Sequence, residues 1–181
     1  MVCILLADGF EEIEALTVVD VLRRANIDIK MVHVDSSDEF VKGSHDITVK
    51  ADCHIDQIQA EDIEMLVLPG GMPGTRNLEN NDKVQALIKS MVERNKWVAA
   101  ICAAPMILGN KGYLKDVEAI CFPGFEKYLC GAVLKNNPVN ISKNFITSKG
   151  PGTAMKFAFA IVSVLQGKET AEQMAKSMQY C

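Results

Sequence analysis

A cysteine stands where a buried strand is predicted to turn into a helix. The segment Trp97–Ile101 has the length and apolarity of a strand covered on both faces, and Pro105 suits the first turn of a following helix. At such a corner the Cys102 sulfur would face the start of the helix, where unpaired N–H groups favour thiolate over thiol. We therefore expect Cys102 to be either a reactive nucleophile or a small buried hydrophobe, which most unpaired cysteines are.

An acidic side chain near the N-terminus could serve this cysteine. Glu11, Glu12 and Glu14 fall in the first turns of a predicted helix, where carboxylates are favoured by the helix dipole alone. Glu14 borders the apolar face that carries Val18, so it is the best placed of the three to point inward. Burial would keep Glu14 protonated, and it could then donate a hydrogen bond to a thiolate.

A glycine-rich loop, residues 69–74, follows the predicted strand Met65–Leu68. It lacks the lysine of a phosphate loop and the G-x-G-x-x-G spacing, so nucleotide binding is weakly supported. Its glycines could bring backbone N–H groups to an oxyanion beside Cys102, or could form a tight turn with a helix cap. Because sites form at the carboxyl ends of parallel strands, we expect this loop, residues 8–14 and residues 102–105 to share one pocket.

The placement of the histidines disfavours a Cys-His hydrolase. His33, His45 and His54 all precede residue 55. His33 lies inside a strand pattern, and the other two lie in the least regular part of the sequence. A catalytic dyad is defined by geometry and not by order in the chain, so this type of site stays a minor alternative.

The elements that must position these groups alternate along the chain. Strands are predicted at residues 2–7, 29–34, 65–68, 97–101 and 117–121, with a strand pair near residues 40 and 47–49 and a hairpin around residues 143–144. Helices are predicted from residue 11, over residues 84–91, 106–108 and 168–178, and over the nearly all-apolar stretch 154–165, which a sheet or a partner subunit must bury. The rhythm predicts one α/β domain over residues 1–181 with a doubly wound, mostly parallel sheet.

The composition limits the possible partners. The chain has 181 residues, of which 49% are hydrophobic and 23% charged, enough for a substantial core. Its net charge is −4 and no basic stripe occurs, so nucleic acid and anionic membranes are poor candidates. The N-terminal apolar run is too short for a signal peptide, which indicates a cytoplasmic protein. Six cysteines without C-x-x-C or Cys/His metal spacing indicate free thiols, and we expect neither metal nor cofactor.

Four motifs, taken in order, resemble those of the ThiJ/PfpI superfamily. They are Glu-Glu-Ile-Glu at 11–14, Leu-Pro-Gly-Gly at 68–71, Ala-Ile-Cys-Ala-Ala-Pro at 100–105 and Ser-Lys-Gly-Pro-Gly-Thr at 148–153. The resemblance covers essentially the whole chain and is closest to the branch of the parkinsonism-associated protein deglycase. It implies a flavodoxin-like fold of the class I glutamine amidotransferase type, with helices on both faces of the sheet, and a homodimer.

The resemblance also implies roles for individual residues. Cys102 would be the reactive thiolate and Glu14 its protonated partner, while the N–H groups of Gly71 and Ala103 would form an oxyanion hole. The further pocket candidates are Gly70, His45, Phe122 and Lys149. The implied activity is conversion of small α-oxoaldehydes such as methylglyoxal without glutathione, or release of glycated adducts. The alternative is an oxidative-stress sensor or chaperone-like protein that uses oxidation of Cys102.

Three positions depart from the family pattern. Phe122 stands where members of this branch often place a histidine, so the proton shuttle is missing or supplied otherwise. This departure favours the sensor alternative, because a sensor needs no shuttle. Ala103 stands where the peptidase-like branch has a histidine, which disfavours proteolysis. His45 replaces an arginine of the relatives, so we expect anion binding to be weaker and dependent on pH.

Overall fold

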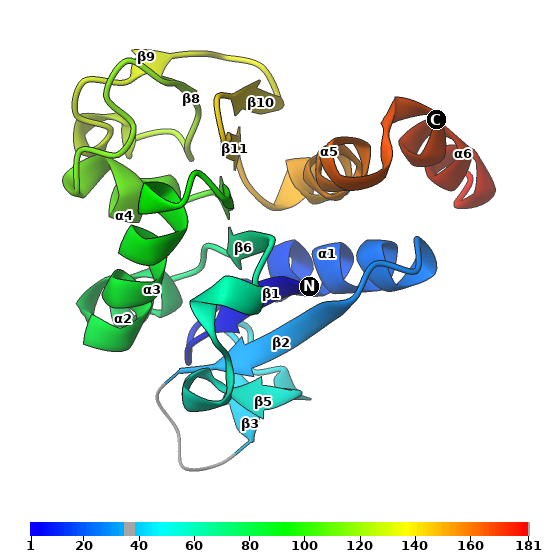
Figure 1. Cartoon of the computed structure of the whole chain (residues 1–181), viewed down its shortest axis with the longest axis horizontal. Helices are drawn as coiled ribbons and strands as arrows, with labels where there is room; N and C mark the ends of the chain where they lie inside the picture. The colour runs from blue at the N-terminus through cyan, green and yellow to red at the C-terminus, as the bar shows by residue number, and fades with distance from the viewer. Residues whose placement is uncertain (35–38, 181) are drawn as a thin grey trace.

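A seven-stranded sheet runs through the middle of the computed structural model, which describes residues 1–34 and 39–180 (Figure 1). The strand order is β10-β11-β7-β6-β1-β2-β5, and every neighbouring pair is parallel except β10 and β11. The strands are β1 (Val2–Leu6), β2 (Ile29–His33), β5 (Cys53–His54), β6 (Met65–Leu68), β7 (Trp97–Ile101), β10 (Val139–Ser142) and β11 (Phe145–Ser148). The predicted mostly parallel sheet is confirmed.

Helices cover both faces of this sheet. They are α1 (Glu12–Arg24), α2 (Gly74–Asn80), α3 (Asp82–Glu93), α4 (Pro105–Asn110), α5 (Ala154–Gln166) and α6 (Lys168–Ser177). One buried cluster joins one face of the sheet to side chains of α2, α3 and α4, and a second joins the other face to α1, α5 and α6. Strands β1 and β6 are buried throughout, as expected for short apolar runs that lie between two helical layers. The flavodoxin-like, doubly wound fold is therefore confirmed.

Both predicted strand pairs also form. Strands β3 (Phe40–Lys42) and β4 (Thr48–Lys50) make a separate antiparallel ribbon. Its loop lies over the start of α1, because the Ser44 N–H donates to the Phe10 carbonyl at 2.8 Å. Strands β10 and β11 form the predicted hairpin around Lys143. Residues 36–38 of the irregular segment lie outside the described residues.

The strand predicted over residues 117–121 is wrong in length and place. Only β8 (Glu118–Ala119) forms, and it pairs with β9 (Val133–Leu134) in a small sheet of its own. Strand β10 occupies the position beside β11 in the main sheet. Side chains therefore accept the N–H groups of this stretch: Ser142 Oγ accepts from Glu118 at 3.2 Å, and Thr147 Oγ1 accepts from Ile120 at 3.0 Å.

Two helices differ from the sequence-based expectation. Helix α2 was not predicted, because Leu78 is its main apolar contribution to the core. Helix α5 is buried on one face rather than all round, where Phe157, Ile161 and Val162 face the core, whereas Met155 and Val164 are half-buried. Helix α6 follows α5 at one end of the molecule, on the side away from α2, α3 and α4 (Figure 1).

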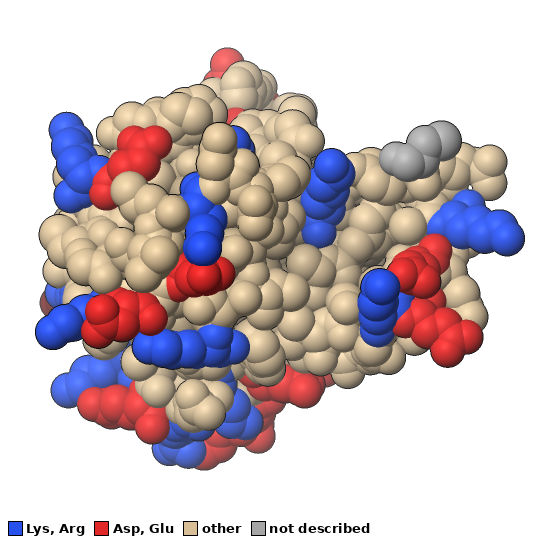
Figure 2. All heavy atoms as spheres, turned by 90° about the horizontal axis from the view of Figure 1, so that it is seen from above, with Lys and Arg blue, Asp and Glu red and all other residues tan. Residues whose placement is uncertain are grey.

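The surface carries charges of both signs. Figure 2 shows Lys and Arg side chains interspersed with Asp and Glu over the face seen from above, with tan surface between them. This pattern agrees with the absence of a basic stripe in the sequence. Across the described ranges, no helix is long and apolar enough to cross a lipid bilayer.

Candidate active site

Cys102 occupies a strained elbow between β7 and α4. Its φ is +65°, a backbone conformation that residues other than glycine rarely adopt. Two hydrogen bonds fix the peptide on both sides: the Cys102 N–H donates to the Ser148 carbonyl at 2.9 Å, and its carbonyl accepts from the Phe122 N–H at 2.7 Å. Pro105 begins α4, as the sequence predicts.

The three loops that were expected to share a pocket do meet. The Glu11 N–H donates to the Gly70 carbonyl at 2.9 Å, and the Gly74 N–H donates to the Gly9 carbonyl at 3.1 Å. Gly70 lies between the two candidate reactive side chains, since an added Cβ would stand 2.6 Å from both Cys102 Cβ and Glu14 Oε2. A glycine is therefore required at position 70 for the thiol and the carboxyl to approach each other.

Glu14 is a fully buried carboxylic acid. Its exposed fraction is 0%, and its Oε2 accepts a 2.7 Å hydrogen bond from the Gly70 N–H. Burial raises the pKa of Glu14 to about 7, a shift that the negative charge of Glu11 adds to and that hydrogen bonds from Cys102 and Gly70 oppose. Its other oxygen, Oε1, is buried without a hydrogen-bond partner in the described part of the chain. This environment shifts the balance of Glu14 toward the protonated acid.

The environment of Cys102 corrects one expectation. Burial raises the pKa of the Cys102 thiol, and the charge of an ionised Glu14 and its hydrogen bond raise it further. The N–H groups of Ala103 and Gly71 point at the sulfur and oppose this shift without overcoming it. The start of α4 therefore does not by itself favour the thiolate, because desolvation is the larger effect. A proton on Glu14 would remove the opposing negative charge.

The described residues give no support to a Cys-His dyad. The groups that bond to the Cys102 sulfur are the Glu14 carboxyl and the N–H groups of Ala103 and Gly71. The rings of His33 and His54 pack against each other with centroids 4.8 Å apart at the β2–β5 edge of the sheet. His33 thus lies in a strand, as predicted.

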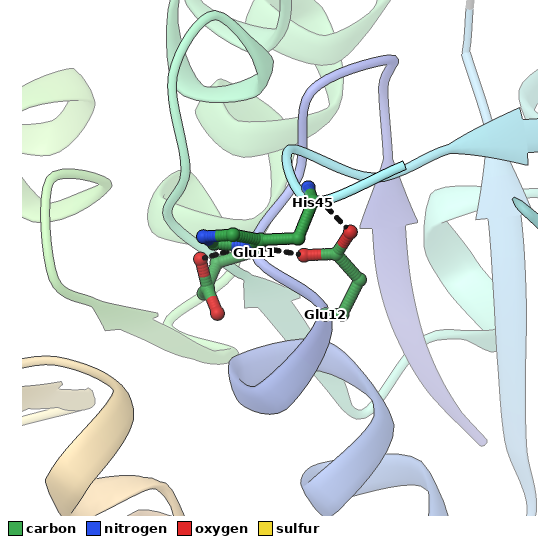
Figure 3. A group of neighbouring side chains, drawn as sticks. All are labelled: Glu11, Glu12 and His45. Carbon is green, nitrogen blue, oxygen red and sulfur yellow. Dashed lines mark hydrogen bonds and ion pairs between the residues drawn. The ribbon is translucent and has the colours of Figure 1, made fainter. Parts of the chain in front are cut away.

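His45 lies over the start of α1 and contacts two carboxylates (Figure 3). Its Nδ1 is 2.9 Å from Glu12 Oε2 and 3.4 Å from Glu11 Oε2. Hydrogen bonding to Glu12, and then the charges of Glu11 and Glu12, raise the pKa of His45. Burial opposes ionisation of Glu12, but hydrogen bonds from His45, from its own backbone and from Ile47 lower its pKa to about 2. His45 is therefore held by acids at the helix start.

The cluster of Glu11, Glu12 and His45 could also hold a metal ion. One ligand atom each from Glu11, Glu12 and His45 lies within 4.8 Å of the others. The hydroxyl of Ser44 also donates to Glu11 and Glu12, at 3.2 and 3.3 Å, so hydrogen bonds within the group already satisfy the carboxylates. Sequence reasoning missed this arrangement, because the helix start and the loop are more than 30 residues apart.

Phe122 and Lys149 border a small pocket next to the cysteine. The Phe122 ring is 42% exposed, and its edge lies 3.1 Å from where a Cβ on Gly150 would stand. The pocket has a volume of about 200 Å³ and is lined by Phe122, Pro123 and residues 149–153. The Lys149 ammonium donates to Asn136 Oδ1 at 2.5 Å.

The five described cysteines are free thiols, as predicted. They are Cys3, Cys53, Cys102, Cys121 and Cys130, and Cys181 lies outside the described residues. Burial raises the pKa of Cys3 to about 11 and that of Cys121 to about 12. What distinguishes Cys102 is its contact with a buried acid and with two N–H groups.

Comparison with known proteins shows the family of this chain. The model of the DJ-1/PfpI family matches residues 1–164. The chain belongs to the DJ-1/PfpI family. The family assignment accounts for the four motifs, which converge around Cys102, Glu14 and the glycine loop. It confirms the resemblance seen in the sequence.

Individual family members match over nearly all of the chain. "Protein DJ-1 homolog B" of Arabidopsis thaliana is 35% identical over 95% of this chain, which spans 39% of that longer protein. "Glutathione-independent glyoxalase DJ-1" of Schizosaccharomyces pombe is 31% identical, with 98% of this chain and 97% of that protein covered. The solved structure of oxidized Toxoplasma gondii DJ-1 is 32% identical and superimposes with a TM-score of 0.94, covering 99% and 98% of the two chains.

Proposed function

We propose that this protein is a cofactor-independent cysteine enzyme, a single domain over residues 1–181, that converts small α-oxoaldehydes such as methylglyoxal to 2-hydroxy acids without glutathione. The observation that carries the proposal is the contact between the buried Glu14 carboxyl and the Cys102 thiol beside the N–H groups of Gly71 and Ala103. The similarity to a relative named as a glutathione-independent glyoxalase supports it.

In the proposed reaction the proton of the pair resides on Glu14 when the sulfur attacks. The Cys102 sulfur bonds to the aldehyde carbon, and the N–H groups of Gly71 and Ala103 stabilise the oxyanion. The oxyanion takes the proton from Glu14 and becomes a hydroxyl group. Glu14 then carries a proton from the former aldehyde carbon to the neighbouring carbonyl carbon while the hydroxyl proton passes to the oxygen of that carbonyl, which leaves a thioester of the 2-hydroxy acid. Water cleaves the thioester and returns the thiol, so aldehyde plus water gives hydroxy acid with no external oxidant or reductant.

Glu14 is the group proposed to carry the proton in this sequence. Phe122 has no ionisable group and cannot act as the shuttle that a histidine would supply. The pKa of Glu14, raised by burial to about 7, lies near neutral pH, where a group is best suited both to accept and to donate a proton. Glu14 therefore takes the part of general base and general acid.

The decisive assay is lactate formation from methylglyoxal without glutathione, with Cys102→Ala as the matched variant. We expect turnover by the wild type and a loss of at least about 100-fold in the variant, because the nucleophile is absent. Unfolding of Cys102→Ala would instead favour a structural role for the buried cysteine. Release of free amine from a glycated peptide, measured on the same two proteins, tests the proposed deglycase activity.

One observation favours a second function, in which Cys102 senses oxidants. The apolar Phe122 supplies no proton shuttle, and a sensor does not need one. One peroxide would oxidise the thiol to a sulfenic acid and a second would oxidise that to a sulfinate, each being reduced to water, and a protonated Glu14 could hydrogen-bond to the sulfinate. Absence of lactate formation, together with selective gain of oxygen atoms at Cys102 by mass spectrometry in dilute peroxide, would favour this function over the enzyme.

We further propose a homodimer in a reducing compartment such as the cytoplasm. Free thiols at the five described cysteines support the compartment. Exposed apolar side chains near the start of α1, Ile13 at 55% and Ile47 at 52%, support a covered surface there.

A further inference from the structure

The small pocket beside Cys102 has an aromatic wall. Phe122 borders it, and Gly150 and Gly152 contribute no side chains to its lining. The ring edge of Phe122 and the sulfur of Cys102 both lie close to Gly150, at 3.1 and 3.9 Å from where its Cβ would stand. A group bonded to the sulfur can therefore reach the ring by extending across Gly150.

Among the described residues that line this pocket, the only charged one is Lys149, and its ammonium is bonded to a residue outside the pocket. The Lys149 ammonium is directed to Asn136, with which it forms a 2.5 Å hydrogen bond. The other lining residues are Phe122, two prolines, two glycines and a threonine. The hydroxyl of that threonine, Thr153, is already engaged with the Gly150 carbonyl at 2.8 Å. The free surface offered to a ligand is therefore mainly apolar.

Neighbouring aromatic rings hold Phe122 in place. Its ring meets Phe125 edge-on with centroids 6.4 Å apart, and Phe125 meets Tyr128 at 5.8 Å. The backbone is also fixed, because the Phe122 N–H donates to the carbonyl of Cys102. A ring that is positioned before a ligand arrives loses little entropy on binding, and edge or offset contacts between rings add to the burial of apolar area.

We propose that this pocket binds an aryl substituent of the substrate, so that Phe122 makes the enzyme prefer aryl α-oxoaldehydes over methylglyoxal, which it also converts. This inference rests on the proposed function of Cys102. The aldehyde carbon bonds to the sulfur, the oxygen faces Gly71 and Ala103, and the aryl ring lies across Gly150 against Phe122. The reaction is the one balanced above: phenylglyoxal plus water gives mandelate.

The test compares phenylglyoxal with methylglyoxal in the wild type and in Phe122→Leu, which keeps an apolar side chain and the backbone N–H but removes the ring. We expect the ratio of kcat/KM for phenylglyoxal to that for methylglyoxal to fall at least about ten-fold in Phe122→Leu, which equals about 1.4 kcal/mol. Phe40→Leu, an exposed phenylalanine on β3, should keep the wild-type ratio. An unchanged ratio in Phe122→Leu would overturn the proposal.

A binding measurement tests the aryl pocket even if the protein converts neither aldehyde. Mandelate and lactate, the two products, are compared as protectants of Cys102 against alkylation by iodoacetamide, followed by mass spectrometry. Protection by mandelate at a concentration at least about ten-fold lower than lactate, lost in Phe122→Leu, supports the aryl pocket. Equal protection by both acids, or the same preference in Phe122→Leu, contradicts it. Failure of the wild type to convert either aldehyde contradicts the proposed enzyme function alone.

Discussion

At the scale of single residues, Glu14 makes the stability of the protein depend on pH. Its pKa is about 7 in the folded chain and 4.5 when exposed, so the folded state holds a proton that the unfolded state has already released. Between pH 4.5 and about pH 7 the free energy of unfolding therefore falls as pH rises, and the loss is complete above about pH 7. The loss is about 3 kcal/mol, from 1.36 kcal/mol per pKa unit.

This gives a first prediction for Glu14→Gln. The uncharged amide cannot ionise, so between about pH 5 and pH 8 the unfolding free energy should decline less in the variant than in the wild type, and the part that remains includes the His45 contribution. Urea unfolding of both proteins across this range measures the difference. Glu172→Gln, on the outer side of α6, is a matched exposed control that should follow the wild type. Parallel pH curves for wild type and Glu14→Gln would mean that Glu14 is ionised throughout in the folded chain.

The sequence predicts these residues unevenly. The inward position of Glu14 follows from helical spacing relative to Val18, and the elbow at Cys102 follows from an apolar strand placed before Pro105. The balance between desolvation and hydrogen bonding at the sulfur could not be predicted, because it depends on how closely Glu14 and two N–H groups approach in three dimensions. That approach depends in turn on the missing side chain of Gly70.

At the scale of elements, the β3–β4 ribbon is fastened to the start of α1. Glu12 Oε1 accepts the His45 N–H at 2.7 Å and its Oε2 lies 2.9 Å from the ring nitrogen, so both carboxylate oxygens hold the loop. The same helix start leads into Glu14. The contact between His45 and Glu12 therefore helps to hold helix α1, which carries Glu14.

A second prediction concerns the pH dependence of this contact. The folded pKa of His45 is raised above 6.5, so its stabilising contribution is fully present below that value and is lost as pH rises through the folded pKa. Ionised Glu12 needs only a pH above about 4.5, its value when exposed. We expect His45→Gln to have a lower urea midpoint than the wild type at about pH 6, and we expect the gap to narrow by about pH 9. A gap that widens with pH would contradict the ion pair.

The elements themselves were predicted best where they are apolar and regular. Strands β1, β6 and β7 and helices α1 and α3 follow from their buried periodicity. The region of β8 was misjudged because Val117 and Ile120 are buried outside the main sheet, and apolarity does not tell which sheet a strand joins. The ion pairs between α1 and the ribbon link distant segments, and no local signal predicts them.

At the scale of the whole molecule, two apolar layers enclose one sheet, and the candidate site lies where three strands end between them. The predicted fold class is confirmed, because alternating strands and helices leave few ways to bury both faces of a parallel sheet. The oligomeric state, unlike the fold class, does not follow from the order of strands and helices. It depends on which exposed side chains find a partner.

A third prediction tests the proposed homodimer. The wild type should sediment with twice the mass of one chain, and Ile13→Asp should sediment with the mass of a single chain, because it places a charge on the exposed apolar part of α1. Lys168→Asp, which places the same acidic side chain at an exposed polar position of α6, should keep the wild-type mass. A wild type that sediments as a single chain would contradict the proposal, and circular dichroism checks that each variant is folded.

The left-handed backbone at Cys102 lowers the stability of the fold at the position that carries the thiol. A residue with a side chain pays about 1 to 2 kcal/mol for this conformation, whereas glycine adopts it freely. Glycine at position 102 would therefore increase the stability of the fold, but it would remove the thiol. The proposed chemistry of the sulfur is therefore the reason we offer for a cysteine, and not a glycine, at this corner.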